Sequence, residues 1–435
     1  MADEPGADLS VSPTSATVPA VTDKPAMAMV TTLFFMWGFL TSLNDILIPH
    51  LKAIFDLTYA EAMLVQFSFF SAYFVFALPS GKLIEWIGYK KAMVAGLLTM
   101  GLGALFFVPA ASQPSFPLFL AALIILAAGI TVLQVSANPY VAVLGPEKTA
   151  SSRLNLTQAF NSLGTTVGPW FGSFLILSGT PAALDSIRGM LPDQLQAYRL
   201  QQASSVKLPY LGLAVALFVL ALIIGKFKLP VISAVEKHGQ VYDSLWKHRS
   251  LVLGAIGIFV YVGAEVSIGS LLVSYMSQPS IGNISVPIAA RFVSLYWGGA
   301  MVGRFIGSAV LRKLRTGMVL GFSALTAFLL VIISILTLGH WAMASILLVG
   351  LFNSTMFPSI FTLSIEGLGP LTGKGSAVLV WAIVGGAIIP EMQGVLADRI
   401  GIHHAFILPA LCYLYIAFFA FKGSESPSGP SVARS

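Results

Sequence analysis

Long apolar runs separated by short polar stretches constrain the fold of this chain more than any other feature. About 20 consecutive apolar residues are enough for a helix to cross a lipid bilayer. Because backbone polar groups find no water there, each run is expected to be helical. The chain contains twelve such runs, at residues 27–55, 59–86, 90–109, 116–145, 151–178, 207–226, 249–277, 286–312, 315–338, 341–366, 372–398 and 402–422.

The composition is typical of a protein that crosses a membrane many times. Charged residues make up 10% of the chain, whereas soluble domains carry about 25%. The net charge of +6 does not indicate nucleic-acid binding, because the basic residues lie in short loops, where they set membrane orientation. With both termini in the cytoplasm, 18 of the 24 lysines and arginines fall on the cytoplasmic side. We therefore expect a multi-pass protein of the inner (plasma) membrane with both termini cytoplasmic.

Polar stretches divide the chain into segments. The stretch at 227–248 leaves six apolar runs on either side, and the two ends of the chain lack apolar periodicity, as disordered tails do. We predict a disordered cytoplasmic tail at 1–26, a six-helix N-terminal half at 27–226, a cytoplasmic linker at 227–248, a six-helix C-terminal half at 249–422 and a disordered tail at 423–435.

An internal repeat indicates that the two halves are related. Pro139 and Pro169 lie 30 residues apart in the first half, and Pro358 and Pro390 lie 32 apart in the second. The loop GKLIEWIGYKK at 81–91 follows, with substitutions, the loop between the second and third helices of major-facilitator transporters. Two parallel six-helix repeats with a substrate site between them are the architecture of that class.

Five short motifs carry a closer resemblance. They are SLNDILIPHLKAIF (42–55), GYKKAMVAGL (88–97), SANPYVAVLGPE (136–147), RLNLTQAFNSLG (153–164) and IVGGAIIP (383–390). Together they resemble the L-fucose–proton symporter family, which includes bacterial glucose/galactose transporters. The resemblance implies an all-α membrane protein of twelve transmembrane helices with the major facilitator fold, and sugar import coupled to protons. It also implies that Asp45 is the first-helix coupling carboxylate and that Gln158 and Asn161 line the sugar cavity.

One position departs from the fucose pattern. Gln134 stands where the fucose symporter has a glutamate, and the glucose/galactose branch of the family also has glutamine there. The departure favours glucose or galactose over fucose, and it puts a proton relay of two carboxylates in doubt.

Two acidic residues lie deep in apolar runs. Asp45 is 18 residues after Met27 and has only Asn44 as a polar neighbour. A charged side chain at that depth costs about 2.5–3.5 kcal/mol or more and usually marks an ion or substrate path. Glu265 is the second deep acid. We predict that Asp45 and Glu265 couple transport to a proton or another cation; the alternative for each is a structural bond between helices.

Amide and aromatic side chains in the runs suit a sugar. Planar amides hydrogen-bond hydroxyl groups, and aromatic rings pack against the apolar side of a sugar ring. Gln134 and Asn138 share one helix face, as do Gln158 and Asn161. Bonding or packing between helices is the alternative, and it is favoured for Asn155. The predicted sugar-binding residues are Asn44, Gln134, Asn138, Gln158, Asn161, Trp297, Asn353 and Trp381.

Other chemistries find little support. His403 and His404 are adjacent, so on a helix they point about 100° apart and make a poor metal pair; no metal site is predicted. An intramembrane enzyme for lipid-linked sugars would need acids with a basic or metal partner, which Asp45 and Glu265 lack in the sequence. Arg304 is expected to snorkel to the inner end of its run. The chain is therefore predicted not to be an enzyme.

These observations predict a secondary transporter that imports a neutral hexose, glucose or galactose, by proton symport with alternating access. The alternatives are a sodium-coupled symporter, an importer of fucose or N-acetylglucosamine, and a sensor that binds sugar without moving it. We expect no cofactor other than the co-transported ion. The expected partners are a small-molecule sugar and the lipid bilayer, and the protein is expected to be monomeric.

Overall fold

A computed structural model describes residues 22–55, 59–175, 190–230 and 244–423, and this part of the chain is helical without strands. The N-terminal helices are α1 (Lys24–Phe55), α2 (Tyr59–Ser112), α3 (Phe116–Val143), α4 (Ala150–Leu175), α6 (Pro192–Ser204) and α7 (Lys207–Lys226). The C-terminal helices are α8 (Arg249–Met276), α9 (Val286–Val310), α10 (Thr316–Leu336), α11 (Gly339–Asn353), α12 (Met356–Ile365), α13 (Thr372–Trp381), α14 (Gly385–Ile400), α15 (Ile402–Ala405) and α16 (Ile407–Phe418).

Twelve membrane spans follow from these helices, as the sequence predicts. Nine stretches of the described chain are long and apolar enough to cross a membrane. One of them, within α2, contains two spans, and α4 and α9 supply two more. Both α4 and α9 carry many polar or small residues for membrane helices. They lie against each other at the junction of the two halves, where such residues are shielded from lipid.

The second and third spans meet at Gly88. This residue has φ 77° and ψ 165°, which interrupts α2 between the predicted runs 59–86 and 90–109. Glycine adopts positive φ without the steric cost that a Cβ would add. Gly88 of the 81–91 loop is therefore required by the backbone conformation with which the chain turns back into the membrane.

The tenth and eleventh spans are each broken in mid-course. The tenth ends one helix at Asn353 and begins the next at Met356, and a short 3₁₀ turn at Ala382–Val384 divides the eleventh. Pro358 and Pro390, which follow these breaks, lack the N–H that a continuous helix needs. Broken helices expose backbone groups, and membranes tolerate this only where protein or a water-filled cavity surrounds the break.

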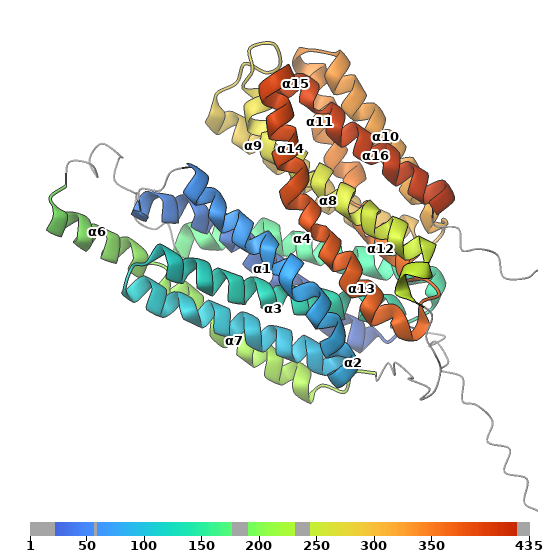
Figure 1. Ribbon diagram of the computed structural model, residues 1–435, viewed down its shortest axis with the longest axis horizontal. Helices are drawn as coiled ribbons and strands as arrows, with labels where there is room; N and C mark the ends of the chain where they lie inside the picture. The colour runs from blue at the N-terminus through green and yellow to red at the C-terminus, as the bar shows by residue number, and fades with distance from the viewer. Residues whose placement is uncertain (1–21, 56–58, 176–189, 231–243, 424–435) are drawn as a thin grey trace, which may run out of the picture.

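The two halves form separate bundles that join at one end. In the first half α1 packs on α4, and α2 packs on α3 and α7; in the second α8 packs on α12, α14 and α16, and α10 on α11 and α16. Figure 1 shows the first half in blue to green and the second in yellow to red, meeting where α12 and α13 lie. We call this end the basic end, because Lys24, Arg153, Arg312 and Lys374 lie there.

Two seams close the basic end. In the α4/α9 seam, Ser152 Oγ donates to Ser308 O at 2.6 Å, and Ser308 Oγ donates to Ser152 O at 3.1 Å. In the α2/α13 seam, Lys374 Nζ lies 2.7 Å from Glu85 Oε1, and a Cβ added to Gly81 would lie 2.8 Å from Ala377 Cβ. A further bond, from Ser376 Oγ to Val135 O at 2.9 Å, ties α13 to α3.

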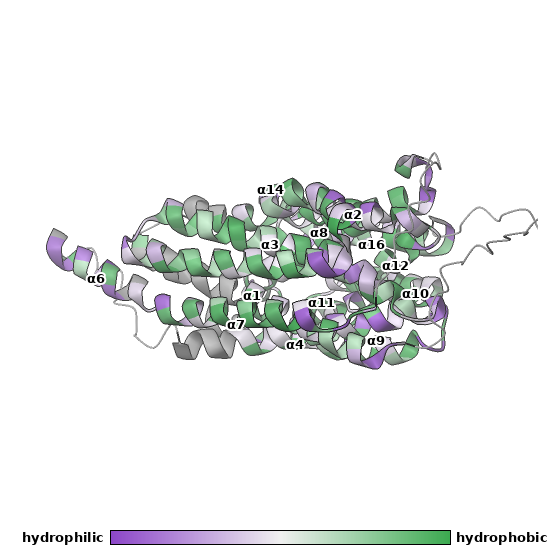
Figure 2. Cartoon of the chain, turned by 90° about the horizontal axis from the view of Figure 1, so that it is seen from below, coloured by the Kyte–Doolittle hydropathy of each residue, from purple (hydrophilic) through white to green (hydrophobic). Residues whose placement is uncertain are grey.

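The outer faces of the spans suit a lipid environment. Large apolar side chains are exposed at helical spacing along α7 and α10, as they are on membrane helices that face acyl chains. Figure 2 shows hydrophobic residues along most helices of the bundle, whereas α6 is largely hydrophilic. The exposed members on α10 include Met318, Phe322, Leu325, Leu329, Ile333 and Leu336.

Parts of the predicted domain division fall outside the described residues. These parts are 1–21 of the first predicted tail, 56–58 and 176–189 of the predicted N-terminal half, 231–243 of the predicted linker and 424–435 of the last predicted tail. The boundaries of the five segments therefore remain predictions.

Candidate functional site

The predicted site residues of the first half whose side chains are described lie on α3 and α4. Gln134 is buried, and its Nε2 donates to the hydroxyl of Tyr73 on α2 at 2.7 Å. Asn138, one turn further along α3, is fully buried, and neither polar atom of its side chain has a hydrogen-bond partner within the described chain. A buried amide with no protein partner is usually satisfied by water or a ligand.

Gln158 and Asn161 are both buried on α4. Asn161 Nδ2 donates to Phe34 O on α1 at 2.9 Å, and a Cβ on the facing Gly38 would lie only 2.0 Å from Asn161 O. The two helices therefore approach closely at this point, and part of the bonding capacity of Asn161 joins them. Asn155 donates to Arg304 O at 2.6 Å across the α4/α9 seam, which agrees with the structural role expected for it.

In the second half, Glu265 is held in a network of hydroxyls and amides. Its Oε1 accepts a hydrogen bond from Tyr261 at 2.8 Å, and its backbone oxygen accepts one from Tyr296 at 3.3 Å. Asn353 Nδ2 donates to the Tyr296 hydroxyl at 2.8 Å, and Tyr261 also donates to Asn353 O at 3.1 Å. The network thus brings two predicted residues, Glu265 and Asn353, together at the break in the tenth span.

Arg304 does not snorkel to the end of its helix, so that expectation was wrong. Its Nη2 lies 3.9 Å from Glu265 Oε1, and its Nη1 donates to Ser162 Oγ on α4. Arg304 lies six residues before the end of α9, about 9 Å inside it, and the nearby carboxylate is the closer partner. Glu265 therefore has a basic partner, which the sequence did not reveal.

The ion pair joins α8 and α9 of the second half, and the bond from Arg304 to Ser162 connects it to the first half. Glu265 and Arg304 belong to the second half, whereas Ser162 belongs to the first. The side chains of the pair are only 12% and 14% exposed. Breaking a buried ion pair costs about 3–5 kcal/mol, so the positions of the helices that carry Arg304 and Tyr261 affect the environment of the Glu265 carboxylate.

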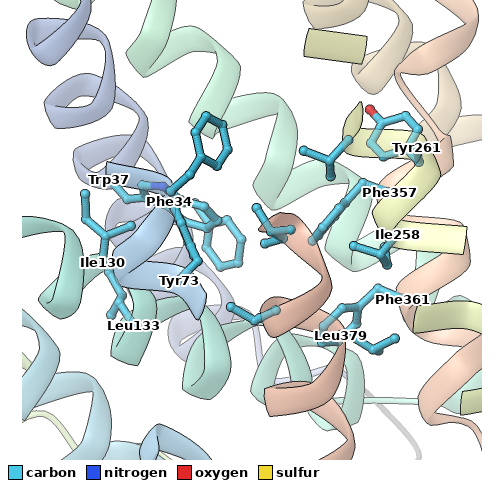
Figure 3. Close-up of a cluster of buried hydrophobic side chains, with 14 of the residues drawn as sticks. Phe34, Trp37, Tyr73, Ile130, Leu133, Ile258, Tyr261, Phe357, Phe361 and Leu379 are labelled. Atoms are coloured by element: carbon cyan, nitrogen blue, oxygen red, sulfur yellow. The ribbon is translucent and has the colours of Figure 1, made fainter. Parts of the chain in front are cut away.

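The two remaining described candidates, Trp381 and Trp297, have different surroundings. Trp381, at the end of α13, packs its ring against Phe74 of the first half with centroids 5.3 Å apart. Trp297 is 43% exposed and lies edge-on to Tyr296, outside the buried network. Figure 3 shows Trp37 and Tyr73 on one side and Tyr261 and Phe357 on the other, so aromatic side chains of both halves gather around the junction.

Asn44 and Asp45 cannot be placed in this arrangement. Their backbone belongs to α1, but their side chains lie outside the described residues. The coupling role of Asp45 and the sugar-binding role of Asn44 remain predictions. No group of three or more His, Cys, Asp or Glu that could hold a metal occurs among the side chains that are described.

Sequence reasoning missed the groups that complete the network. Arg304, Ser162 and the hydroxyl of Tyr261 were not singled out as site residues, because each is a common residue type with several structural uses in a membrane helix. One signal was available, since an arginine two turns inside a predicted span must find a partner.

Comparison with known proteins gives matches that extend over most of the chain. The family model of the Major Facilitator Superfamily matches residues 29–390. The chain is 53% identical over 403 residues to the glucose/galactose transporter of Brucella abortus, with 92% of this chain and 94% of that protein covered. It is 47% identical to a putative glucose/galactose transporter of Helicobacter pylori and 36% identical to the L-fucose–proton symporter of Escherichia coli, each over 92% of this chain.

Solved structures agree with the fold. A crystal structure of the fucose–proton symporter FucP in the outward conformation superposes with a TM-score of 0.86 at 35% identity, covering 92% of this chain and 99% of that one. The proton:xylose symporter XylE has a TM-score of 0.65 at 15% identity, and this match concerns the fold alone.

Proposed function

Since the chain belongs to the Major Facilitator Superfamily, we propose that it imports a neutral hexose, glucose or galactose, by symport with protons. The match to the Brucella glucose/galactose transporter over nearly the whole of both chains carries this proposal. The proton is supported by the fucose–proton symporters among the relatives and neighbours. Gln134, where the fucose symporter has a glutamate, supports a hexose other than fucose.

The amides of the first half are proposed to bind the sugar hydroxyls. Gln134, Gln158 and Asn161 are buried on α3 and α4, and Asn138 has two unpartnered polar atoms that a hydroxyl or a water could satisfy. Asn353 and Trp381 border the breaks in the tenth and eleventh spans. Transporters often place their substrate sites at such breaks near the middle of the membrane.

Coupling is proposed to run through Asp45, with the Glu265–Arg304 pair as the second charged element. Alternating access requires the two seams at the basic end to open. Because Arg304 bonds Ser162 across the α4/α9 seam, opening that seam removes one partner of the arginine. The loss of this bond would alter the surroundings of Glu265, so the properties of the carboxylate would depend on whether the α4/α9 seam is open or closed.

The basic end is proposed to face the cytoplasm, following the positive-inside rule. The seams hold this end closed, so the described state would be open or occluded toward the outside. The similar fucose symporter structure is in an outward conformation, which supports the same assignment. A chain of this kind would reside in the inner membrane of a bacterium.

Uptake into proteoliposomes tests the proposal. The purified chain is reconstituted, and accumulation of labelled glucose and galactose is followed under an imposed pH gradient, with and without a sodium gradient. Uptake that follows the pH gradient and stops with an uncoupler is expected. Uptake that depends on the sodium gradient would overturn the proposed coupling to protons. Saturable sugar binding without uptake would indicate a sensor.

Fucose is the second candidate, because one relative of 36% identity is a fucose–proton symporter. Competition decides between the two. Unlabelled glucose or galactose is expected to block uptake of the labelled hexose at concentrations at which fucose does not. The reverse order would make fucose the substrate.

A further inference from the structure

A large cavity opens beside the α4/α9 seam at the basic end, away from the buried network around Glu265. Its volume is about 810 Å³. Its walls come from α1 and α4 of the first half and from the segment that follows α9 in the second. The side chains that line it form a cationic set, a hydroxyl set (Thr22, Thr31, Thr32, Thr149 and Ser152) and an apolar set. The apolar set includes Met27, Ala28, Phe35, Leu156, Phe160 and Leu163.

The cationic set consists of Lys24, Arg153 and Arg312. Lys24 and Arg312 are exposed, so both can turn toward a ligand. Arg153 is buried, and its five N–H groups are all used, donating to Val141 O, Ala142 O, Gly145 O, Pro146 O and Thr149 Oγ1.

These bonds leave the charge of Arg153 in place without pairing it to an acid, since all five acceptors are neutral. None of the residues that line the cavity in the described chain is acidic. The nearby Asp23 caps α1 by accepting a hydrogen bond from Ala26 N at 2.9 Å. The mouth of the cavity therefore combines two movable cations with one fixed cation, and it favours an anion.

The apolar wall has the length of one lipid leaflet. From Lys24 to Phe35 α1 rises by about 16 Å, and from Arg153 to Leu163 α4 rises by about 15 Å. Half of a bilayer hydrocarbon core is about 15 Å thick. A ligand that fits the cationic and the apolar set must thus carry an anionic head and an apolar chain about as long as one leaflet is deep.

We propose that this cavity is a binding site for an anionic phospholipid of the leaflet at the basic end. The phosphate would lie between Lys24 and Arg312, and an acyl chain would run along α1 and α4 toward Phe35 and Leu163. Basic pockets between membrane helices bind anionic head groups in this way. A free anion such as phosphate would use the mouth and leave the apolar wall empty.

The site has a consequence for transport that rests on the proposed function. Lys24 belongs to the first half and Arg312 to the second. A phosphate between them bridges the halves beside the α4/α9 seam, and it loses one of its two partners when the seam opens. The lipid therefore stabilises the state closed at the basic end.

Lipid retention by the full chain tests the site without any sugar. The protein is purified in detergent and incubated with phosphatidylglycerol or phosphatidylcholine, and bound lipid is counted by native mass spectrometry. The double variant Lys24→Gln/Arg312→Gln is compared with Lys313→Gln/Arg315→Gln. The control removes the same charge from two exposed residues of the loop that holds Arg312, and these residues do not line the cavity.

Wild type and control are expected to retain phosphatidylglycerol over phosphatidylcholine, and the cavity variant is expected to retain about tenfold less of it. Ala28→Phe, which fills the wall without changing charge, should also reduce retention. Equal retention by both double variants, or of both lipids, would overturn the site. So would complete displacement of the lipid by equimolar glycerol phosphate, because the wall would then contribute nothing. Each result is independent of whether the chain transports a hexose.

Discussion

The polar interiors of the two halves differ although their architecture repeats. In the first half, the described site residues are neutral amides, and Gln134 and Asn161 each make one bond to a neighbouring helix. In the second half, Glu265 and Arg304 form a charged pair enclosed by tyrosine hydroxyls. Neutral amides with spare capacity suit a ligand rich in hydroxyls, whereas an enclosed ion pair suits a response to conformation. From this comparison we infer that the first half binds the sugar and that the ion pair of the second half responds to the conformational state.

Asp45→Asn is expected to have the largest effect, because Asp45 would place a charge-changing group in the half that otherwise carries neutral site residues. The amide permanently mimics the protonated acid. Concentrative uptake into proteoliposomes should be lost, while exchange of sugar across the membrane continues. Accumulation at the wild-type level would show that Asp45 is structural, and the division of labour between the halves would then lack its coupling group.

Glu265→Gln tests whether the second half depends on its ion pair. The change removes the one acidic partner that Arg304 has among the described side chains, and breaking a buried pair costs about 3–5 kcal/mol. A lower midpoint of thermal unfolding is expected. The double variant Glu265→Gln/Arg304→Gln should recover much of the loss, because neither charge remains.

Glu391→Gln is the matched control for this prediction, since Glu391 is exposed on α14. It should leave the midpoint nearly unchanged. If Glu265→Gln is as stable as the control, the pair contributes nothing to stability. If it also accumulates sugar as the wild type does, Glu265 takes no part in coupling.

Gln158→Ala and Asn161→Ala separate sugar binding from helix contact in the first half. Each removes an amide from a proposed hydroxyl partner, at a cost of about 1–3 kcal/mol, or roughly tenfold in affinity measured by calorimetry. Asn161 also bonds Phe34 O, so its variant should lose stability in the sugar-free protein as well. Gln158→Ala should lose affinity alone. A variant of Gln158 that loses stability and affinity together would make it a contact between helices.

The sequence predicted the architecture well because length and apolarity decide which segments span a membrane. Helical spacing also predicted that Gln134 shares a helix face with Asn138, and Gln158 with Asn161; all four are buried in the structure. The sequence could not predict the partner of Glu265. Arg304 lies 39 positions away in the chain, and only the packing of α8 on α9 brings the two together.

The contacts in the seams could not be predicted from the sequence either, for a related reason. Serine occurs throughout membrane helices as a packing residue, so nothing marks Ser152 and Ser308 as partners. The distance between them in the chain is 156 residues. Their pairing depends on how the two halves dock, and no local pattern carries that information.

The smallest predicted effect concerns these two serines. Ser152→Ala/Ser308→Ala removes both reciprocal bonds of the α4/α9 seam, each worth about 0.5–1.5 kcal/mol net. The released carbonyls remain within helices, so little penalty is left behind. The population open at the basic end should rise by about fivefold or more. Spin labels on cysteines introduced at Lys91 and Lys313, which are exposed on opposite halves, would report this as a longer distance.

The control for this measurement lies within one half. Ser323 of α10 bonds Thr355, which lies between α11 and α12, at 3.0 Å within the second half, so Ser323→Ala removes a comparable bond outside both seams. The native Cys412 is buried and is replaced by alanine as a precaution in every variant. A shift in the distance for the seam variant but not for Ser323→Ala would locate the closure in the α4/α9 seam. An equal shift in both would be a general effect of losing a serine hydroxyl, and no shift in either would show that the Ser152–Ser308 bonds do not hold the basic end closed.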